Sequence, residues 1–140
     1  MLRILAFDIG ERRIGVAVSD PLGITAQGIE TYTRSDDLQK DVSHLLNLAN
    51  GYKPVKLVFG MPRNMDGSYG MQADYTRAFA DEVLKGWDGD HAYWDERLTT
   101  ASARRMLIEA DVRRDKRKGV IDKVAAVLIL QSYLDAKGNT

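Results

Sequence analysis

The chain has 140 residues, of which 44% are hydrophobic and 29% charged, and this composition predicts one soluble globular domain over residues 1–140. It contains no cysteine, which excludes disulfides, thiolate metal sites and catalytic thiols. Its 20 basic and 20 acidic residues give a net charge of zero, so the overall charge does not by itself predict a polyanionic partner.

The N-terminal third predicts an antiparallel meander of three strands. The first strand, Leu2 to Phe7, is apolar and ends at Asp8, and the second, Ile14 to Val18, alternates with small residues. The linker between them, residues 10–13, is short enough for a hairpin, so the two strands should pair antiparallel. A third strand near Gly28 to Thr33 completes the meander.

The rest of the chain alternates helical and strand patterns. The expected elements are, in order, a helix at Asp36 to Asn50, a strand at Val55 to Phe59, a helix at Tyr69 to Lys85, a strand at His91 to Trp94, a helix from Thr99 or Thr100 to about Ala110 and a helix at Ile121 to Leu134. Ser35 is the expected N-cap of the first helix, and Gly51 its C-terminal glycine. The turn-rich stretch from Gly60 to Gly67 predicts a loop, and the basic stretch from Arg113 to Gly119 predicts a mobile loop.

A meander followed by strand–helix–strand crossovers predicts the α/β class. We expect a mixed five-stranded sheet, in which the three antiparallel strands are joined by two parallel ones, with helices on both faces. This is the element order of the ribonuclease-H-like fold. No repeat, low-complexity tract or linker divides the chain.

Three acids stand where such a sheet positions its ligands. Asp8 directly follows the first strand and Glu96 follows the last, and open α/β sheets bind ligands at the carboxyl ends of their strands. Asp122 falls in the first turn of the last expected helix. Each acid has an ordinary alternative role: Asp8 as a turn aspartate, Glu96 and Asp122 as acids that favour a helix N-terminus.

The three carboxylates together predict a metal site if they converge at one edge of the sheet. They could hold two divalent ions about 3.5–4 Å apart, the arrangement that stabilises an in-line phosphoryl displacement. Mg²⁺ or Mn²⁺ suits such oxygen ligands, whereas His44 and His91 lack the spacing of zinc ligands. We therefore expect Asp8, Glu96 and Asp122 to be the ligands of a divalent-metal site suited to phosphoryl displacement.

Four motifs follow one another along nearly the whole chain. They are Asp8-x-Gly10-x-x-Arg13-Ile14-Gly15-Val16-Ala17, Gly60-x-Pro62-x-Asn64-Met65-Asp66-Gly67, Asp95-Glu96-Arg97-Leu98-Thr99-Thr100 and Lys118-Gly119-Val120-Ile121-Asp122-x-x-Ala125-Ala126. With these motifs the chain resembles the YqgF/RuvX family, the Holliday-junction-resolvase-like proteins also described as pre-16S ribosomal RNA nucleases. The resemblance implies a ribonuclease-H-like fold and a nuclease that hydrolyses phosphodiester bonds in structured nucleic acid. It also implies that Asp8, Glu96 and Asp122 are the catalytic acids and bind a divalent metal. It favours processing of the 5′ end of pre-16S rRNA over cleavage of branched DNA.

Several basic residues are candidates for contact with the phosphates of the substrate. They are Arg13 and Arg97 beside the acids, and the run Arg113, Arg114, Lys116, Arg117 and Lys118 before Asp122. Contacts between such residues and phosphates supply the sequence-independent part of nucleic-acid affinity. The ordinary alternatives are a solvated loop for the run and salt bridges to neighbouring acids for the two arginines.

Two other interpretations stay open at this point. Asp8-Ile9-Gly10 followed by a second strand also resembles the phosphate-binding hairpin of actin-like ATPases and sugar kinases, although those proteins bind nucleotide between two such domains and this chain supplies one. A non-catalytic module that binds nucleic acid or the ribosome would keep the fold without turnover. The intact set of three acids argues against this second interpretation.

The expected location follows from the apolar runs of the sequence. The N-terminal run meets Asp8 too early for a signal peptide, and no apolar stretch reaches the roughly 20 residues of a membrane span. We expect a cytoplasmic protein without membrane contact, whose partner is nucleic acid. A homodimer is expected only if it cuts junctions symmetrically, since that reaction needs two sites.

Overall fold

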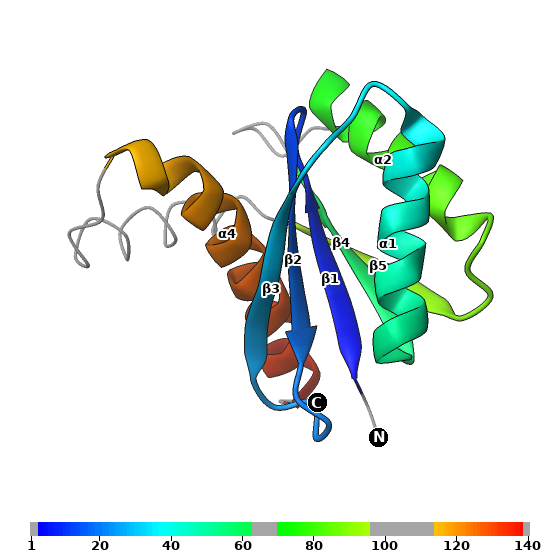
Figure 1. Cartoon of the computed structure of the whole chain (residues 1–140). Coiled ribbons are helices and arrows are strands. Elements are labelled where there is room, and N and C mark those ends of the chain that lie inside the picture. Colours follow the sequence, from blue (N-terminus) through cyan, green and yellow to red (C-terminus); the bar gives the residue numbers. More distant parts are fainter. Residues whose placement is uncertain (1–2, 63–69, 96–113, 139–140) are drawn as a thin grey trace.

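Five strands form one mixed sheet in the computed structural model, which describes residues 3–62, 70–95 and 114–138 (Figure 1). The strands are β1 (Ile4–Ile9), β2 (Arg13–Ser19), β3 (Ala26–Thr33), β4 (Lys56–Met61) and β5 (Asp90–Asp95). Their order across the sheet is β3-β2-β1-β4-β5. β1 pairs antiparallel with β2, and β2 with β3, whereas β4 is parallel to both β1 and β5. The expected meander, the two added parallel strands and the α/β class are therefore confirmed.

Helices cover both faces of this sheet (Figure 1). α1 (Leu38–Tyr52) and α2 (Met71–Leu84) pack on one face, and α4 (Arg114–Gly138) packs on the other. No helix in the described part of the chain is long and apolar enough to span a membrane. The helix expected at residues 99–110 lies outside the described residues.

β1 separates two apolar clusters because its side chains alternate between the faces of the sheet. Leu5, Phe7 and Ile9 belong to the cluster beneath α1 and α2, and Ala6 belongs to the cluster beneath α4. Burial on both faces explains why this run is almost entirely apolar and why it lies at the centre of the sheet. The same alternation places Asp8, two residues after Ala6, on the α4 face.

The turn between β1 and β2 is a tight hairpin, as expected. Ile9 pairs with Ile14, and the Gly10 N–H donates to the Arg13 carbonyl over 2.9 Å. A Cβ atom at Gly10 would stand 2.6 Å from the Arg13 carbonyl oxygen, closer than real Cβ atoms approach. Glycine at this position therefore lets β2 return directly beside β1.

The ends of α1 differ from those expected. Its N-cap is Asp37, whose carboxylate accepts from the backbone N–H groups of Gln39 and Lys40, and Ser35 lies outside the helix. Gly51 is still helical, and the chain leaves the helix at Lys53, which adopts the left-handed conformation with φ 51°. Both corrections concern one or two residues, the usual scale of uncertainty at helix ends.

The prediction of a loop over the basic stretch is wrong in part, because α4 begins at Arg114. Lys and Arg are good helix formers, so a run without apolar residues can still continue a helix whose other half is packed. Asp122 lies eight residues after Arg114 and is not in the first turn. The alternative role of Asp122 as an acid at a helix N-terminus is therefore wrong.

Candidate functional site

Asp8 is the predicted acid whose surroundings the structure describes. It lies within β1, one residue before the strand ends, and is partly buried. Its partner on β2 is Gly15. On the other side Phe7 pairs with Phe59 of β4, so the residue level with Asp8 there is Gly60. Because neither flanking position carries a side chain, the sheet itself leaves room for a ligand beside this carboxylate on the α4 face.

The other two predicted acids lie outside the described side chains. Glu96 follows Asp95, the last residue of β5, and lies outside the described residues. Asp122 has its backbone in α4, but the described side chains of this helix run from Val124 to Ala136. Within the described ranges no group of three or more His, Cys, Asp or Glu could hold a metal ion. Two of the three acids of the predicted site, Glu96 and Asp122, therefore have side chains that the structure does not describe.

The basic candidates divide in the same way. Arg13 begins β2, two residues from Gly15, and the alternation of side chains places it on the same face as Asp8. Arg114, Lys116, Arg117 and Lys118 are helical residues of α4 whose side chains are outside the description. Arg97 and Arg113 lie outside the described residues. Arg13 is thus the basic candidate that the described structure brings close to Asp8.

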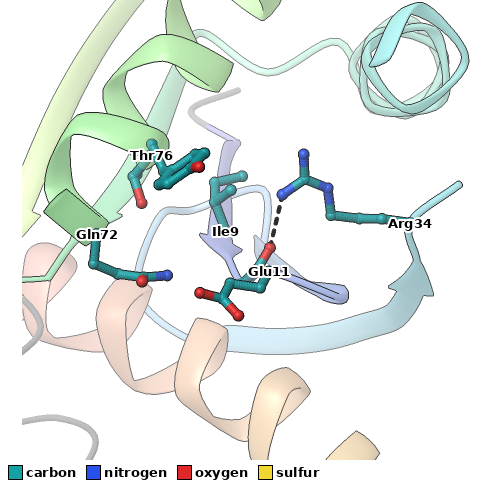
Figure 2. A pocket seen from close by; sticks show the side chains of 7 residues that line it. Ile9, Glu11, Arg34, Gln72 and Thr76 are labelled. Atoms are coloured by element: carbon teal, nitrogen blue, oxygen red, sulfur yellow. Dashed lines mark hydrogen bonds between the residues drawn. The ribbon is translucent and has the colours of Figure 1, made fainter. Parts of the chain in front are cut away.

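A pocket of about 300 Å³ opens at the same end of β1, beside the hairpin and α2 (Figure 2). Its lining residues come from three separate segments and are Ile9, Gly10, Glu11, Arg34, Gln72, Tyr75 and Thr76. Ile9 belongs to the cluster beneath α1 and α2, so the pocket lies on the side of the sheet opposite Asp8. The end of β1 therefore carries an acid on one face and a pocket on the other.

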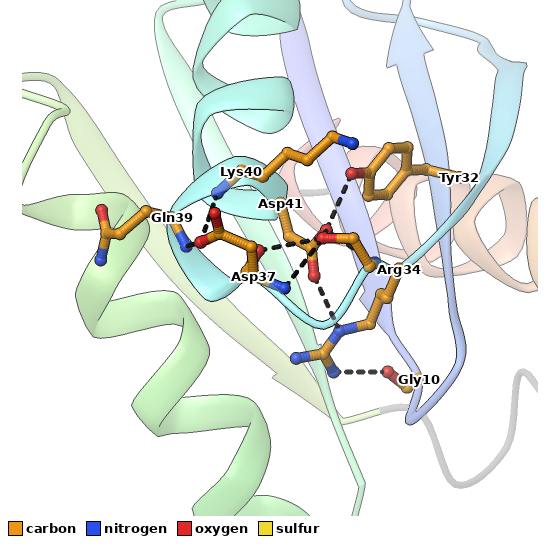
Figure 3. Close-up of polar contacts among 8 residues, drawn as sticks. Gly10, Tyr32, Arg34, Asp37, Gln39, Lys40 and Asp41 are labelled. Atoms are coloured by element: carbon orange, nitrogen blue, oxygen red, sulfur yellow. Dashed lines mark hydrogen bonds and ion pairs between the residues drawn. The ribbon is translucent and has the colours of Figure 1, made fainter.

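A buried carboxylate, Asp41, contacts Arg34, one of the residues that line this pocket (Figure 3). It accepts from the Tyr32 hydroxyl over 2.8 Å and from the Ser35 N–H and hydroxyl over 2.9 Å, and it pairs with the Arg34 Nε at 3.6 Å. Burial alone would raise the pKa of Asp41, but these hydrogen bonds and the Arg34 charge outweigh it and hold the pKa below 3.8. Asp41 is therefore a charged group around which α1 and β3 are joined.

Arg34 extends the same network to the hairpin. One of its terminal nitrogens donates to the Gly10 carbonyl over 2.9 Å, and its guanidinium lies 4.8 Å from the centre of the Phe79 ring on α2. One side chain thus joins β3, the β1–β2 hairpin and α2. Arg34 thus links the hairpin to α2 beside the pocket.

The pocket residues were not predicted from the sequence. Glu11, Arg34 and Thr76 are far apart in the chain; Glu11 is an unspecified position of the first motif, and Arg34 and Thr76 lie outside all four motifs. One signal was present: Tyr75 is a large aromatic residue that falls outside the apolar stripe of its helix, between the buried Ala73 and Thr76. An aromatic side chain at a solvent-facing helical position is a feature that a search for binding residues can use.

Comparisons with known proteins agree with the fold and extend over the whole chain. A protein from Clostridium tetani named "Putative pre-16S rRNA nuclease" is 47% identical over 138 residues, covering 99% of both chains. A protein of the same name from Halothermothrix orenii is 52% identical over 134 residues, covering 96% of this chain and 95% of its own.

Two solved Holliday junction resolvases share this fold at low sequence identity. T. thermophilus RuvC, solved in complex with a Holliday junction substrate, superposes with a TM-score of 0.64 at 12% identity and covers 100% of this chain and 98% of its own. The yeast mitochondrial resolvase superposes with a TM-score of 0.62 at 10% identity, covering 98% and 79%. These likenesses confirm the ribonuclease-H-like fold. The family model described as RuvX, Holliday junction resolvase, matches residues 2–136, and the chain therefore belongs to the RuvX family.

Proposed function

We propose that this chain is a divalent-metal-dependent nuclease that hydrolyses phosphodiester bonds in structured RNA, with the 5′ end of pre-16S rRNA as its substrate. The observation that carries the proposal is the position of Asp8: a carboxylate at the carboxyl end of the central strand, between two glycines, in a chain about half identical to proteins named for this activity. An RNA substrate of this kind also implies a cytoplasmic location.

The register of the sheet supports a site shared by Asp8 and Asp122. Ile4 of β1 is level with Lys56, and the Lys56 Nζ donates to the Tyr133 hydroxyl of α4 over 2.7 Å. From Ile4 to Asp8 the strand rises about 13 Å. From Tyr133 back to Asp122 the helix rises about 16 Å. Since α4 runs opposite to β1, position 122 comes to the level of Asp8.

The stripe of α4 that contacts the sheet supports the same arrangement. Ala126 belongs to the apolar cluster that contains Ala6 of β1, and it lies one helical turn after position 122. Positions four apart share one side of a helix. This spacing supports the proposal that Asp122 belongs to the sheet-facing stripe of α4, across from the side of β1 that carries Asp8.

The donor set of the proposed site suits Mg²⁺ or Mn²⁺. Carboxylate oxygens at Asp8, Glu96 and Asp122 are the ligands these cations prefer, and the glycines beside Asp8 leave space for an ion and its waters. When bound, the metal would neutralise phosphate charge and lower the pKa of a water. Asp8 would hold this position from a rigid strand, and Arg13, on the same face, would contact a neighbouring phosphate of the substrate.

Branched DNA is the second candidate substrate, because the family description names Holliday junction resolvases. Symmetric cleavage of a junction needs two active sites, so this function requires a homodimer, whereas trimming of an rRNA end does not. The relatives at 47% and 52% identity favour RNA.

The test is cleavage of a labelled pre-16S rRNA leader and of a four-way DNA junction, with Mg²⁺ or Mn²⁺. We expect wild-type protein to cut the RNA, and Asp8→Asn to lower the rate by at least about a hundredfold, because altering groups around a metal already costs 10–100-fold. Asp90→Asn is the matched control, since Asp90 is exposed at the amino end of β5 and should keep full activity.

Three outcomes would contradict the proposal in different ways. Activity that survives Asp8→Asn would show that Asp8 is not a catalytic residue. Cleavage of the junction but not of the RNA, by a protein that sediments as a dimer, would favour the resolvase function. Tight binding of Mg–ATP without any cleavage would favour the actin-like alternative.

A further inference from the structure

Thr76 is a buried polar group that the fold leaves without a hydrogen bond. Its side chain is 1% exposed, and its Oγ1 has no partner among the described residues. Leaving a buried hydroxyl without a hydrogen bond is unfavourable, so nearly all such groups have a partner. The Thr76 side chain lines the pocket beside the hairpin, where a ligand could supply the missing hydrogen bond.

Two apolar surfaces of this pocket suit a flat, aromatic ligand. Tyr75 is 67% exposed, although an aromatic ring of this size gains by being covered, and Ile9 forms a buried wall. Nucleobases stack favourably on exposed aromatic side chains of this kind. A pocket of about 300 Å³ has room for one base and its sugar and excludes a duplex.

The polar rim of the pocket indicates which base would fit. The Glu11 carboxylate from the hairpin and the Gln72 amide from α2 point toward one another (Figure 2). An ionised carboxylate only accepts hydrogen bonds. Guanine is the base with two adjacent N–H donors, N1–H and N2–H, on its Watson–Crick edge, and these match the two oxygens of one carboxylate.

We propose that the pocket formed by Ile9, Glu11, Gln72, Tyr75 and Thr76 binds one unstacked nucleobase of the substrate strand, with a preference for guanine. In this arrangement the base stacks on Tyr75, donates to Glu11 and pairs with the Thr76 hydroxyl. Arg34, held by Asp41 and by the Gly10 carbonyl, keeps the hairpin and α2 at the separation that the base needs. The assignment of the ligand as part of a substrate strand rests on the proposed nuclease function.

The distance between the pocket and Asp8 fits a role in choosing the cleavage position. Asp8 and Glu11 are three residues apart, so their Cα atoms are separated by at most roughly 11 Å. They lie on opposite sides of the end of β1, and a single strand passing over the hairpin can meet both. A guanine held in the pocket would fix which neighbouring phosphate comes to Asp8.

Binding of free mononucleotides tests the pocket without any cleavage. We would titrate metal-free wild-type protein with GMP, AMP, CMP and UMP and follow its backbone amides by ¹H–¹⁵N NMR. GMP should give saturable shifts at Glu11, Tyr75 and Thr76, with an affinity roughly tenfold above that of AMP, because a hydrogen bond to a charged group contributes at least about 1.5 kcal/mol. Absence of saturable shifts at these amides with every nucleotide would overturn the proposal.

Variants separate a ligand role from a structural one. Glu11→Gln should remove the preference for GMP, whereas Asp74→Asn, the same charge change at an exposed position of α2 outside the pocket, should keep it. Thr76→Val should weaken GMP binding while raising the Tm of the free protein, since it removes an unpaired buried hydroxyl. Equal GMP affinity in wild type, Glu11→Gln and Thr76→Val would contradict the assigned contacts.

Cleavage then relates the pocket to the substrate. RNA cut by wild type at a fixed distance from a guanine should be cut at scattered positions by Tyr75→Ala, and at the wild-type position by Met71→Ala, an exposed control on the same helix. Failure of the nuclease proposal would appear as activity in Asp8→Asn with GMP binding intact. Failure of the pocket proposal would appear as loss of cleavage in Asp8→Asn without any nucleotide shift in the wild type.

Discussion

Asp41 shows how a charged residue can be a structural element of a fold rather than part of its chemistry. It is 1% exposed, yet it remains ionised because Tyr32, Ser35 and Arg34 all direct donors or positive charge at it (Figure 3). Burial without such partners would raise the pKa of a carboxyl group and favour its protonated, neutral form. Here the hydrogen bonds lower the pKa below 3.8, and the charged form stabilises the fold.

The consequence for stability depends on pH. Since the pKa of Asp41 is lower in the folded chain than in the unfolded one, its contribution is fully present above the ordinary value of 3.8 and is lost as the pH falls through the folded pKa. We expect Asp41→Asn to lower the free energy of unfolding by about 2 kcal/mol at neutral pH, because a buried charged acceptor loses several donors. The difference from wild type should shrink in buffers below pH 3.8.

Urea unfolding across this pH range measures the effect. Asp36→Asn is the control, because Asp36 is exposed one residue before the N-cap and should change stability by less than about 0.5 kcal/mol at any pH. A loss for Asp41→Asn that stays constant from neutral to acid pH would show that the contribution of Asp41 is one of packing.

Residue chemistry at the start of α1 also shows a limit of prediction from sequence. Ser35 and Asp37 are both good N-cap residues, and local preference does not choose between them. The choice is made by Asp41, which takes up the Ser35 N–H and hydroxyl and leaves Asp37 to cap the helix. The position of Asp41 depends in turn on Tyr32 and Arg34 at the end of β3. These are tertiary contacts, and the sequence around the start of α1 does not reveal them.

At the scale of elements, the helical form of the basic run changes what its residues can do. In a loop all four described basic positions would be equivalent, but a helix distributes them around its axis. By helical spacing Lys118, four residues before Asp122, shares the side of the helix on which we propose Asp122 to lie, whereas Lys116 lies six residues before Asp122 and about a third of a turn away. Lys118 therefore shares the side of the helix on which the proposed site lies.

We expect Lys118→Ala to weaken RNA binding more than Lys116→Ala does. A lysine on the site's side of the helix can contact a phosphate next to the cleaved bond, and its loss should reduce the slope of log K against log salt by about one. Filter binding by an Asp8→Asn background at several salt concentrations gives these slopes. Equal effects of the two substitutions would mean that the basic run attracts RNA through its overall charge and not through one lysine. Unchanged slopes would mean that the run does not contact the RNA.

The prediction of a loop at this run failed for a physical reason. An amphipathic pattern reveals a helix through its apolar stripe, and residues 113–118 contain no apolar side chain. The helix exists there because its second half is held on the sheet, where the Trp94 Nε1 donates to the Ser132 hydroxyl over 3.0 Å and Lys56 to Tyr133. Propagation of a helix from a packed half costs little free energy, and the basic sequence of residues 114–118 carries no apolar pattern that would reveal it.

At the scale of the whole molecule, stability and metal binding should be separable. The described core consists of two apolar clusters on either side of the sheet, and neither contains an acid of the proposed site. We expect EDTA to abolish cleavage while leaving the far-ultraviolet circular dichroism spectrum and the Tm almost unchanged. Re-addition of Mg²⁺ should restore activity.

The effect of Mg²⁺ on the Tm tests whether the metal binds at Asp8. In the Asp8→Asn variant, added Mg²⁺ should raise the Tm less than in wild type, because a ligand that binds only the folded state stabilises it in proportion to its affinity. Unfolding by EDTA alone would show that the metal is part of the core. An equal Mg²⁺ effect in both proteins would place the ion elsewhere.

The sheet could be predicted from the sequence because each of its strands has a local pattern of apolar residues bounded by turn residues. The run before Asp8, the hairpin at Gly10 and the crossovers through α1 and α2 fix the strand order with few alternatives. The pocket could not be predicted, because it joins the hairpin, the end of β3 and one side of α2, and only the folded chain brings Glu11, Arg34 and Thr76 together.

The alternation along β1 also restricts how the length of this strand can change during evolution. Inserting one residue before Asp8 would turn its carboxylate into the cluster around Phe7 and expose an apolar side chain on the α4 face. Inserting two would restore both faces and move the acid one pleat along the sheet. A change of one residue in this strand therefore disturbs both the core and the proposed site, whereas a change of two keeps each side chain on its own face of the sheet.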